Sequence, residues 1–370
     1  MSVVRNVLIV SASIGSGHTQ AAKAVKAELK RQHPQSNAIV VDFFAGDSFS
    51  LTHFAKVTYL KMIDSFPHVY DVLYRRSKAS QEGTAVRDAV SWILKKRMLR
   101  LVEEHKPDLI VFTHPFPCGA ACRLKRKGKL NVPLAGVITD YAIHHLWVYD
   151  EVDIYFVAAE AMAATLGEQG VPRERIQITG IPVGSAFGQV TKQVADQTEP
   201  TILVMGGGLG LGALEEVLLQ LDTIEEACRF IVVTGRNSRL RKGLQRQSAT
   251  MKHPLLVMGY TQRIPELMAC SQLLITKPGA LTCSEAMAAG LPMVLVNAIP
   301  GHEEDNAAYL HRHGAAIWVK EKAGLSTVVK ELLGNREQME TLRQQAWKLG
   351  KPDAAGYIVQ HLKCFGINAI

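Results

Sequence analysis

The sequence predicts an α/β protein made of two doubly wound, Rossmann-like domains. Short apolar runs alternate with helical patterns along the chain, which is the rhythm of consecutive βαβ units. This rhythm breaks near 180–184 and through the polar stretch 189–200, and then restarts. We therefore expect one domain over residues 1–185 and a second over 186–370, with the last helix a candidate to cross back onto the first. Parallel sheets bind ligands at the carboxyl ends of their strands, so we expect the two domains to face each other across a substrate cleft.

The apolar runs give the expected strands of both sheets. The chain has 370 residues, of which 47% are hydrophobic, and this is enough for two separate cores. The expected strands lie at 7–11, 38–42, 109–113, 134–139 and 154–158 in the first domain, and at 201–205, 230–234, 255–258, 273–276 and 293–296 in the second. Helices are expected between most of them, including one over Thr19 to Arg31.

The start of the chain and its cysteines indicate a cytoplasmic protein. Met1 is followed by a single arginine and a short apolar run, which is too short to span a membrane and lacks a signal-cleavage pattern. The six cysteines form no CxxC pair, so we expect reduced packing residues in place of disulfides or a zinc site.

One stretch carries most of the positive charge. The formal net charge is +8, and residues 50–130 hold 16 Lys and Arg against 7 Asp and Glu. The stretch is also rich in aromatic residues, and basic residues flank an apolar stripe over 92–101. This combination suits an anionic membrane surface, so we expect peripheral attachment to the inner face of the cell membrane. A solvated basic face is the alternative, and nucleic acid is disfavoured because no recognition motif accompanies the charge.

A glycine turn at 13–18 brings a histidine to the start of the first long helix. Gly15 and Gly17 allow close approach of a ligand, and we count Gly17 among the donor-binding candidates. The positive end of a helix disfavours an imidazolium, so a neutral His18 suits a general base that removes a hydroxyl proton. The alternative is a histidine that only caps or packs against its own turn.

A second loop of the first domain follows the strand at 134–139. Asp140 is expected to orient a histidine or hold an acceptor hydroxyl, although it equally suits a helix N-cap. His145 and Trp147 are candidates for contact with the acceptor, where the indole suits a sugar ring or an acyl chain. His144 and His145 are neighbours in sequence, and neighbours rarely converge on one ion, so we expect no metal site.

Glycine loops of the second domain predict a nucleotide diphosphate. The loop Gly206–Gly210 follows a strand and precedes a helix, but it lacks the GxGxxG spacing of dinucleotide sites. The loops after the next two strands offer an arginine for phosphate and exposed backbone groups for a pyrimidine edge. The donor-binding candidates in these loops are Gly207, Gly208, Arg236, Asn237, Gly259 and Tyr260.

The run from Thr276 to Asn306 is the most informative part of the chain. A buried strand leads into a glycine loop and then into a helix that is expected to begin near Thr282. A helix N-terminus offers backbone N–H groups and a positive dipole end to phosphate, and Glu285 can accept hydrogen bonds from a ribose diol. The donor-binding candidates here are Lys277, Gly279, Ala280, Thr282 and Glu285.

With these motifs in place, the chain resembles the family of processive diacylglycerol glucosyltransferases and monogalactosyldiacylglycerol synthases, which are relatives of the peptidoglycan glycosyltransferase that makes lipid II. The resemblance runs essentially from end to end. It rests on the GxGH loop at 15–18, Thr139-Asp-Tyr with His145-Leu-Trp147, Thr179-Gly-Ile-Pro182, Gly235-Arg-Asn237, Ile275-Thr-Lys-Pro-Gly279 and Pro300-Gly-His-Glu-Glu-Asp-Asn306.

The resemblance implies the GT-B fold and an inverting glycosyltransferase. The enzyme would move a hexose from a UDP-sugar, with UDP-glucose or UDP-galactose favoured, to a lipid acceptor such as diacylglycerol. The UDP-sugar is a substrate, and no cofactor is expected. The resemblance assigns the ribose to Glu285, the base to His18, and the donor sugar to Glu303 and Asn306. Glu304, in the same loop, is a further donor-binding candidate. His302 stands where the family usually has glutamine, which leaves the donor sugar open.

The expected reaction is a single displacement. An acceptor hydroxyl, deprotonated by His18, attacks the anomeric carbon while helix N-termini stabilise the leaving diphosphate. The sequence has no Asp-x-Asp motif of the kind that carries a divalent metal, which agrees with stabilisation by helix dipoles. Two alternatives stay open: a non-hydrolysing UDP-sugar epimerase and a non-catalytic UDP-sugar sensor.

Overall fold

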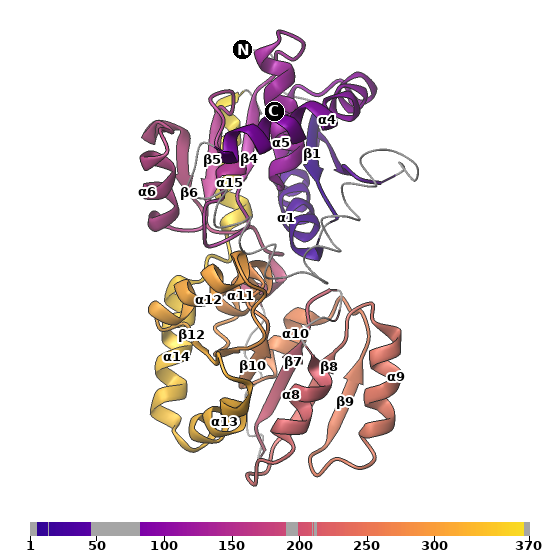
Figure 1. The fold of residues 1–370 in the computed structure, drawn as a ribbon, viewed down its shortest axis with the longest axis vertical. Coiled ribbons are helices and arrows are strands. Elements are labelled where there is room, and N and C mark those ends of the chain that lie inside the picture. Colours follow the sequence, from indigo (N-terminus) through magenta and orange to yellow (C-terminus); the bar gives the residue numbers. More distant parts are fainter. Residues whose placement is uncertain are drawn as a thin grey trace. The chain divides into compact units, whose positions relative to one another are not determined.

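A computed structural model describes residues 6–13, 15–45, 82–189, 199–208, 210 and 213–365 (Figure 1). For 82–90 and 322 it describes the backbone alone. Most of the polar stretch at 189–200 and the first part of the basic stretch, 50–81, therefore lie outside the described residues. All ten expected strands are present, with ends that agree within two residues.

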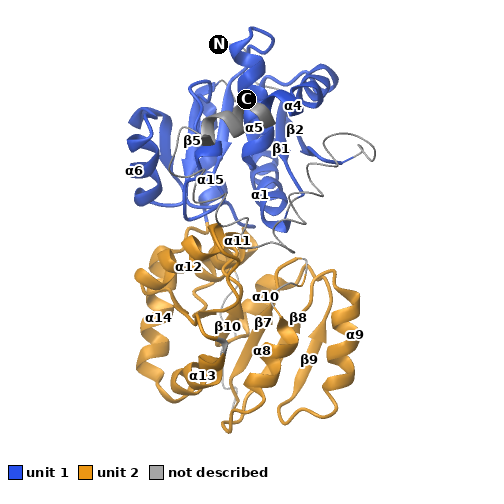
Figure 2. Cartoon of the chain, viewed as in Figure 1, with its two compact units in different colours: residues 1–184, 353–370 blue, residues 185–352 orange. Residues whose placement is uncertain are grey.

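The chain divides into two compact units (Figure 2). The first unit comprises Met1–Gly184 together with Asp353–Ile370, and the second comprises Ser185–Pro352. The division thus falls one residue before the expected boundary at 185/186, and the last helix returns to the first unit.

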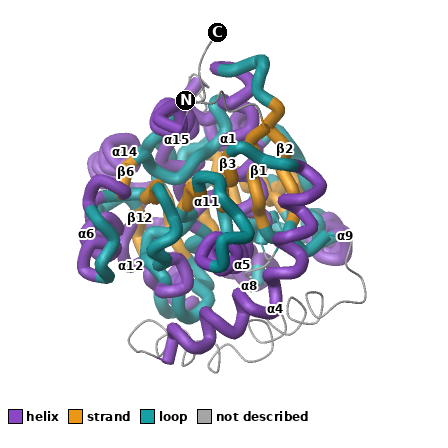
Figure 3. Tube along the Cα trace, turned by 90° about the horizontal axis from the view of Figure 1, so that it is seen from above, coloured by secondary structure: helices purple, strands orange, loops and turns teal. Residues whose placement is uncertain are grey.

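The first unit contains a six-stranded parallel sheet of order β2-β1-β3-β4-β5-β6. Its strands are β1 (Asn6–Ser11), β2 (Asn37–Asp42), β3 (Leu109–Phe112), β4 (Leu134–Val137), β5 (Ile154–Val157) and β6 (Ile176–Ile178). Figure 3 shows β2, β1 and β3 side by side. The strand order changes direction between β1 and β3, because β2 lies on one side of β1 and all later strands lie on the other. Doubly wound sheets bind ligands at such a switch point.

Helices surround this sheet and complete its core. They are α1 (Ser16–Gln32), α4 (Glu82–His105), α5 (Pro115–Arg126), η1 (His145–Trp147), α6 (Glu160–Glu168), η2 (Arg173–Arg175), α15 (Ala354–Leu362) and η4 (Lys363–Phe365). Ile9 of β1, Val25 of α1 and Ile358 of α15 are fully buried in one hydrophobic cluster. The last helix therefore joins the first unit because its apolar face packs beside α1 on this sheet.

The second unit has a parallel sheet of order β12-β11-β10-β7-β8-β9. Its strands are β7 (Thr201–Met205), β8 (Arg229–Val233), β9 (Leu255–Met258), β10 (Leu273–Thr276), β11 (Met293–Leu295) and β12 (Ala316–Trp318). Here the order changes direction between β7 and β10. The carboxyl ends of these two strands are followed by the glycine loop at 206–210 and the loop at 277–279, so the topology brings the two predicted phosphate loops next to each other.

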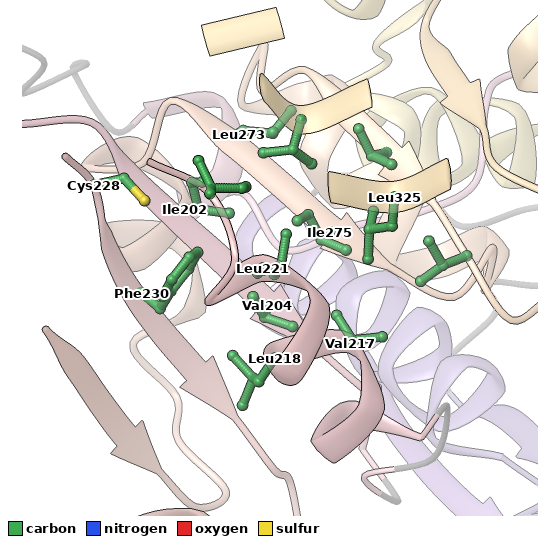
Figure 4. Packing of buried hydrophobic residues seen from close by; sticks show 14 of the residues in the cluster. Ile202, Val204, Val217, Leu218, Leu221, Cys228, Phe230, Leu273, Ile275 and Leu325 are labelled. Atoms are coloured by element: carbon green, nitrogen blue, oxygen red, sulfur yellow. The ribbon is translucent and has the colours of Figure 1, made fainter. Parts of the chain in front are cut away.

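The helices of the second unit bury a continuous apolar core. They are α7 (Ala186–Gln189), α8 (Leu214–Leu221), α9 (Ser238–Gln247), α10 (Ile264–Ala269), α11 (Ala280–Ala288), α12 (His302–Arg312), η3 (Lys322–Gly324), α13 (Leu325–Gly334) and α14 (Arg336–Leu349). Figure 4 shows Leu218 of α8 over Val204 of β7, with Ile275 of β10 in the same cluster. Complete burial of a leucine side chain is worth roughly 1.5–3 kcal/mol, so this cluster anchors the strands that carry the loops.

The structure differs from the sequence expectation in four elements. The strands β6 and β12 were not predicted, because each is a three-residue run at a sheet edge. The helix expected near Thr282 begins at Ala280. The helix expected directly after Gly210 begins at Leu214, since Ala213 has a left-handed backbone, with φ of 50°, before the first helical turn.

Candidate active site

The loop between β10 and α11 leads into a helix N-terminus that suits an anion. Gly279 is the N-cap of α11, no side chain caps this helix, and its first turn contains no acidic residue. The backbone N–H groups and the positive dipole end of α11 therefore suit a phosphate group. The amide of Asn306, which is fully buried, donates a 3.2 Å hydrogen bond to the carbonyl of Pro278 and fixes the loop.

Lys277 places a positive charge in the same loop. Its ammonium group forms an ion pair with the Glu303 carboxylate, whose side chain is only 3% exposed. The second oxygen of Glu303 accepts a 3.0 Å hydrogen bond from the Ile299 N–H. Glu303 thus ties the loop after β10 to the segment before α12, and its predicted contact with the donor sugar stays a prediction.

Glu285 lies in the second turn of α11 and is half-buried. Burial raises the pKa of its carboxyl group to about 8, because desolvation disfavours the charged form. At neutral pH the group is therefore largely protonated in the absence of a ligand. Hydrogen bonds from a ribose diol would favour the carboxylate and lower this pKa.

The loop after β7 packs backbone against backbone on the loop after β8. Gly235 has φ of +58°, and a Cβ atom there would lie 2.6 Å from the Gly208 carbonyl oxygen. The Arg236 N–H donates a 3.1 Å hydrogen bond to that same oxygen. Glu215 and Glu216 occupy the first turn of α8, which offsets the positive end of that helix. The predicted cradle at Gly207 and Gly208 consequently relies on backbone groups and on the nearby Lys277 side chain.

The residues after β8 and β9 that are predicted to contact the nucleoside also make contacts within the protein. The Arg236 guanidinium lies over the Tyr260 ring, 5.3 Å from its centroid, and Tyr260 is about half exposed. Asn237 caps α9, since its side-chain oxygen accepts a 3.0 Å hydrogen bond from the Leu240 N–H. A Cβ atom on Gly259 would lie 3.0 Å from the Arg241 guanidinium.

The remaining donor candidates lie at the starts of α11 and α12. Ala280 is buried and Thr282 is half-buried in the first turn of α11. His302 is the first residue of α12, directly after Gly301, whose φ is 94°. Glu304 reaches back to this turn, where its carboxylate accepts a 3.5 Å hydrogen bond from the Gly301 N–H. Glu304 therefore acts in this structure as a helix cap.

His18 lies in the first turn of α1, at the switch point of the first sheet. Its Nδ1 is 2.8 Å from the Thr113 carbonyl oxygen and 2.8 Å from the Thr139 hydroxyl oxygen. The Thr113 hydroxyl donates a 3.0 Å hydrogen bond to the His18 carbonyl. A carbonyl partner favours the tautomer with the proton on Nδ1, which leaves the lone pair of the neutral ring on Nε2. This arrangement suits a general base.

The structure brings His114, which sequence reasoning missed, against the candidate base. The two imidazole centroids are 4.7 Å apart and the ring planes meet at 75°. Burial lowers the pKa of His114 well below its ordinary value, and the neighbouring His18 lowers it further. The available sequence signal was its position directly after a buried strand, where it caps the next helix.

The loop after β4 contains three candidates, of which two are half-buried and one is buried. Asp140 follows Thr139, which contacts His18, and is half-buried. His145 is half-buried at the start of η1. Trp147 was expected to contact the acceptor, but its side chain is only 3% exposed and packs near Gly136 in the core. Its carbonyl accepts a 2.8 Å hydrogen bond from the Tyr155 hydroxyl, so Trp147 is a packing residue in this structure.

Metal and membrane-spanning features are absent from the described part of the chain. Among the described residues, no three His, Cys, Asp or Glu side chains are placed to hold a metal ion. None of the helices described combines the length and the apolar character needed to cross a bilayer. The six cysteines are unpaired as disulfides, and four of them are buried.

Two family models match the chain in succession. The model of monogalactosyldiacylglycerol (MGDG) synthase matches residues 18–183. The model of the glycosyltransferase family 28 C-terminal domain matches residues 201–357. The boundary between these matches falls where the first unit gives way to the second.

A curated relative and two solved structures extend the comparison. The processive diacylglycerol beta-glucosyltransferase of Bacillus cereus (strain 03BB102) is 31% identical over 364 residues, with 95% of this chain and 92% of the relative covered. MurG of Acinetobacter baumannii has a TM-score of 0.63 and 16% identity, with 97% and 99% covered. UDP-GlcNAc 2-epimerase from Neisseria meningitidis, bound to UDP-GlcNAc, has a TM-score of 0.58 and 15% identity, with 96% and 98% covered. The two structures show a shared fold, and the predicted GT-B architecture is confirmed.

Proposed function

Because the chain belongs to the family of monogalactosyldiacylglycerol synthases and processive diacylglycerol glucosyltransferases, and is thus a family 28 glycosyltransferase, we propose that it transfers a hexose from a UDP-sugar to diacylglycerol or a similar lipid. UDP-glucose and UDP-galactose are the favoured donors, since the curated relative is named a glucosyltransferase and one matching family model is that of monogalactosyldiacylglycerol synthase.

The observation that carries the proposal is the loop at the switch point of the second sheet. The open N-terminus of α11 supplies backbone N–H groups to a diphosphate, and Lys277 adds a positive charge beside them. Glu285, one turn further along, suits the ribose hydroxyls. The stacked Arg236 and Tyr260, after the neighbouring strands, suit the uracil end of the nucleotide.

In the proposed reaction His18 acts as the general base. Its Nε2 removes the proton from the acceptor hydroxyl, whose oxygen then bonds to the anomeric carbon while the bond to the diphosphate breaks. Attack from the face opposite the diphosphate inverts the anomeric configuration. General base catalysis contributes about 10²- to 10⁴-fold, and the α11 start with Lys277 stabilises the charge that grows on the leaving diphosphate.

Attachment to an anionic membrane surface is the second part of the proposal, and α4 supports it. Trp92 is 55% exposed and Ile93 is 37% exposed on this helix. The ammonium group of Lys95 lies 5.0 Å from the centroid of the Trp92 ring. Desolvation and the positive charges of Lys127, Arg123, Lys129 and Lys96 lower the pKa of Lys95, which shows how closely basic groups gather here. We expect this face of α4 to meet the inner leaflet of the cell membrane.

Product analysis tests the proposal directly. The full chain is incubated with UDP-glucose, UDP-galactose or UDP-GlcNAc and with liposomes that contain diacylglycerol, and the lipid products are separated by mass spectrometry. We expect a hexosyl lipid from one of the first two donors. If no donor yields a glycolipid and donor alone is isomerised, the epimerase is correct instead.

A His18→Ala variant distinguishes a catalytic enzyme from a protein that only binds the donor. His18→Ala should retain affinity for UDP, because all the donor-binding candidates except Gly17 lie in the second unit, and should lose about 10²-fold or more in transfer. Unchanged transfer by this variant would remove His18 from the role of base. A wild-type chain with donor affinity and no transfer would favour the sensor.

A further inference from the structure

The imidazole of His114 contacts the candidate base, His18, and has no role in the reaction proposed above. Its ring meets the ring of His18 edge to face, and His114 itself is only 5% exposed. The backbone just before it supplies the Thr113 carbonyl that contacts His18 Nδ1. The end of β3 therefore provides both the hydrogen-bond partner and a packing wall for the same imidazole, which restricts its rotation.

The hydrogen bonding of His114 fixes its own protonation. As the N-cap of α5, its Nδ1 accepts a 3.2 Å hydrogen bond from the Phe116 N–H. This bond needs the lone pair on Nδ1, so the neutral ring carries its proton on Nε2. A second proton would break the cap, and burial already disfavours the charged form.

The residues around His114 and His18 come from α1, α5 and the end of β4. His18 is the titratable group that packs on His114 from α1, and Phe116 of α5 contributes an uncharged ring at 4.9 Å. Thr139, at the end of β4, contacts His18 through a hydroxyl group that does not titrate. Asp140 is the carboxylate next in sequence to Thr139.

We propose that His114 is a positioning residue for His18, an inference that rests on the proposed function. The His114 ring holds the His18 imidazole in the orientation that presents Nε2 to the acceptor hydroxyl. It also remains neutral, so it adds no second positive charge beside His18 when His18 takes the acceptor proton.

The test uses two substitutions that both preserve the helix cap. Asparagine and aspartate are good N-caps, so His114→Asn and His114→Asp should both keep α5 in place. Two quantities are measured on the full chain: the pH dependence of kcat/KM, and the pKa of His18 by NMR of ring-labelled histidine without any substrate.

We expect His114→Asn to lower kcat about 10- to 100-fold, as for a misplaced catalytic group, with the donor KM within about twofold. The pKa of His18 should be about 1 unit higher in His114→Asp than in His114→Asn, because a carboxylate beside an imidazole favours the imidazolium. The pH at which kcat/KM falls on the acidic side should be higher in His114→Asp by the same amount. A wild-type kcat in His114→Asn, or equal His18 pKa values in the two variants, would overturn the proposal.

Control variants separate positioning from simple helix stability. His114→Phe keeps a ring but loses the acceptor, so we expect a lower Tm with a smaller loss of kcat than in His114→Asn. Asn335→Ala removes the cap of α14, where the Asn335 side chain accepts a 3.0 Å hydrogen bond from the Gln338 N–H. It should lower Tm and leave the pH profile unchanged. If the wild-type chain transfers no sugar, the proposed function is wrong. The NMR titration would then still show whether the residue at position 114 changes the pKa of His18.

Discussion

Lys277 and Glu303 form a largely buried ion pair that joins the loop after β10 to the first turn of α12. Their side chains are 17% and 3% exposed. The Glu303 carboxylate also accepts the Ile299 N–H, so one acidic group fixes both a charge and a backbone turn. The pair therefore determines where the Lys277 ammonium group lies relative to the start of α11.

Removal of one partner should cost more than removal of both. Lys277→Met leaves the buried Glu303 carboxylate without its counter-ion, and we expect the free energy of unfolding to fall by about 3–5 kcal/mol. Adding Glu303→Gln should recover most of that loss. Urea unfolding of the single and double variants measures the coupling. As a control, Lys330→Met breaks an exposed pair with Glu226, 3.8 Å apart, and should cost no more than about 1 kcal/mol. Additive losses at 277 and 303 would contradict the coupling.

Glu285 should distinguish ribose from deoxyribose. A hydrogen bond between a charged group and a hydroxyl contributes about 1.5–3 kcal/mol, so Glu285→Ala should weaken UDP binding by that amount. The same substitution should cost less for 2′-deoxy-UDP, which keeps only the 3′-hydroxyl of the diol. Calorimetry with both ligands measures the difference. Equal losses for the two nucleotides would place Glu285 away from the ribose.

The raised pKa of Glu285 should make stability depend on pH. The folded value of about 8 lies above the ordinary value of 4.5, so the folded state holds this proton more tightly than the unfolded state does. The stabilising contribution is therefore complete below about pH 4.5 and is lost as pH rises through 8. Glu285→Gln should flatten the fall in unfolding free energy between pH 5 and 8. Urea unfolding across this range checks the slope, and parallel curves for the two proteins would contradict it.

Gly235→Ala should disturb the phosphate loop. The φ of +58° is strained for alanine, and the new Cβ atom would lie 2.6 Å from the Gly208 carbonyl oxygen and 2.7 Å from that of Gly207. We expect a loss of about 1–3 kcal/mol in stability together with weaker UDP binding. The matched control is Gly334→Ala at the end of α13, where a Cβ atom meets nothing within 4 Å. Thermal unfolding and calorimetry of both variants provide the measurements, and wild-type UDP affinity in Gly235→Ala would exclude this loop from the donor site.

The basic face of α4 should control membrane binding. Each lysine near an anionic surface contributes about 1 kcal/mol, so joint replacement of Lys95 and Lys96 by alanine should weaken binding to anionic vesicles roughly 30-fold. Trp92→Ala should weaken it further by removal of the exposed ring. Trp347→Ala, at a tryptophan that is 71% exposed on α14, is the control and should have no effect. Vesicle sedimentation at several salt concentrations measures the affinities. Binding that ignores both anionic lipid content and salt would refute membrane attachment through this face.

The local features of the candidate site were predictable, while its side-chain partners were not. Lys277, Glu285 and His18 were proposed from the loops and helix starts on which the structure places them, because a few neighbouring residues are enough to form a glycine turn or a helix N-terminus. The burial of Trp147 was not predictable, since its exposure depends on packing near Gly136, a residue of another element. Glu303 was expected at the donor sugar, and only the fold reveals its pairing with Lys277.

Ten of the twelve described strands, the helices between most of them and the loops that follow the strands could be read from the sequence alone, because periodicity and turn chemistry act over a few residues. Which of these loops meet depends on the folded arrangement of the strands. His18 contacts Thr113, 95 residues away, and Thr139, 121 residues away, because β1, β3 and β4 lie next to one another in the sheet. The order of strands in a sheet depends on the packing of the whole core, so it cannot be predicted from a local sequence pattern.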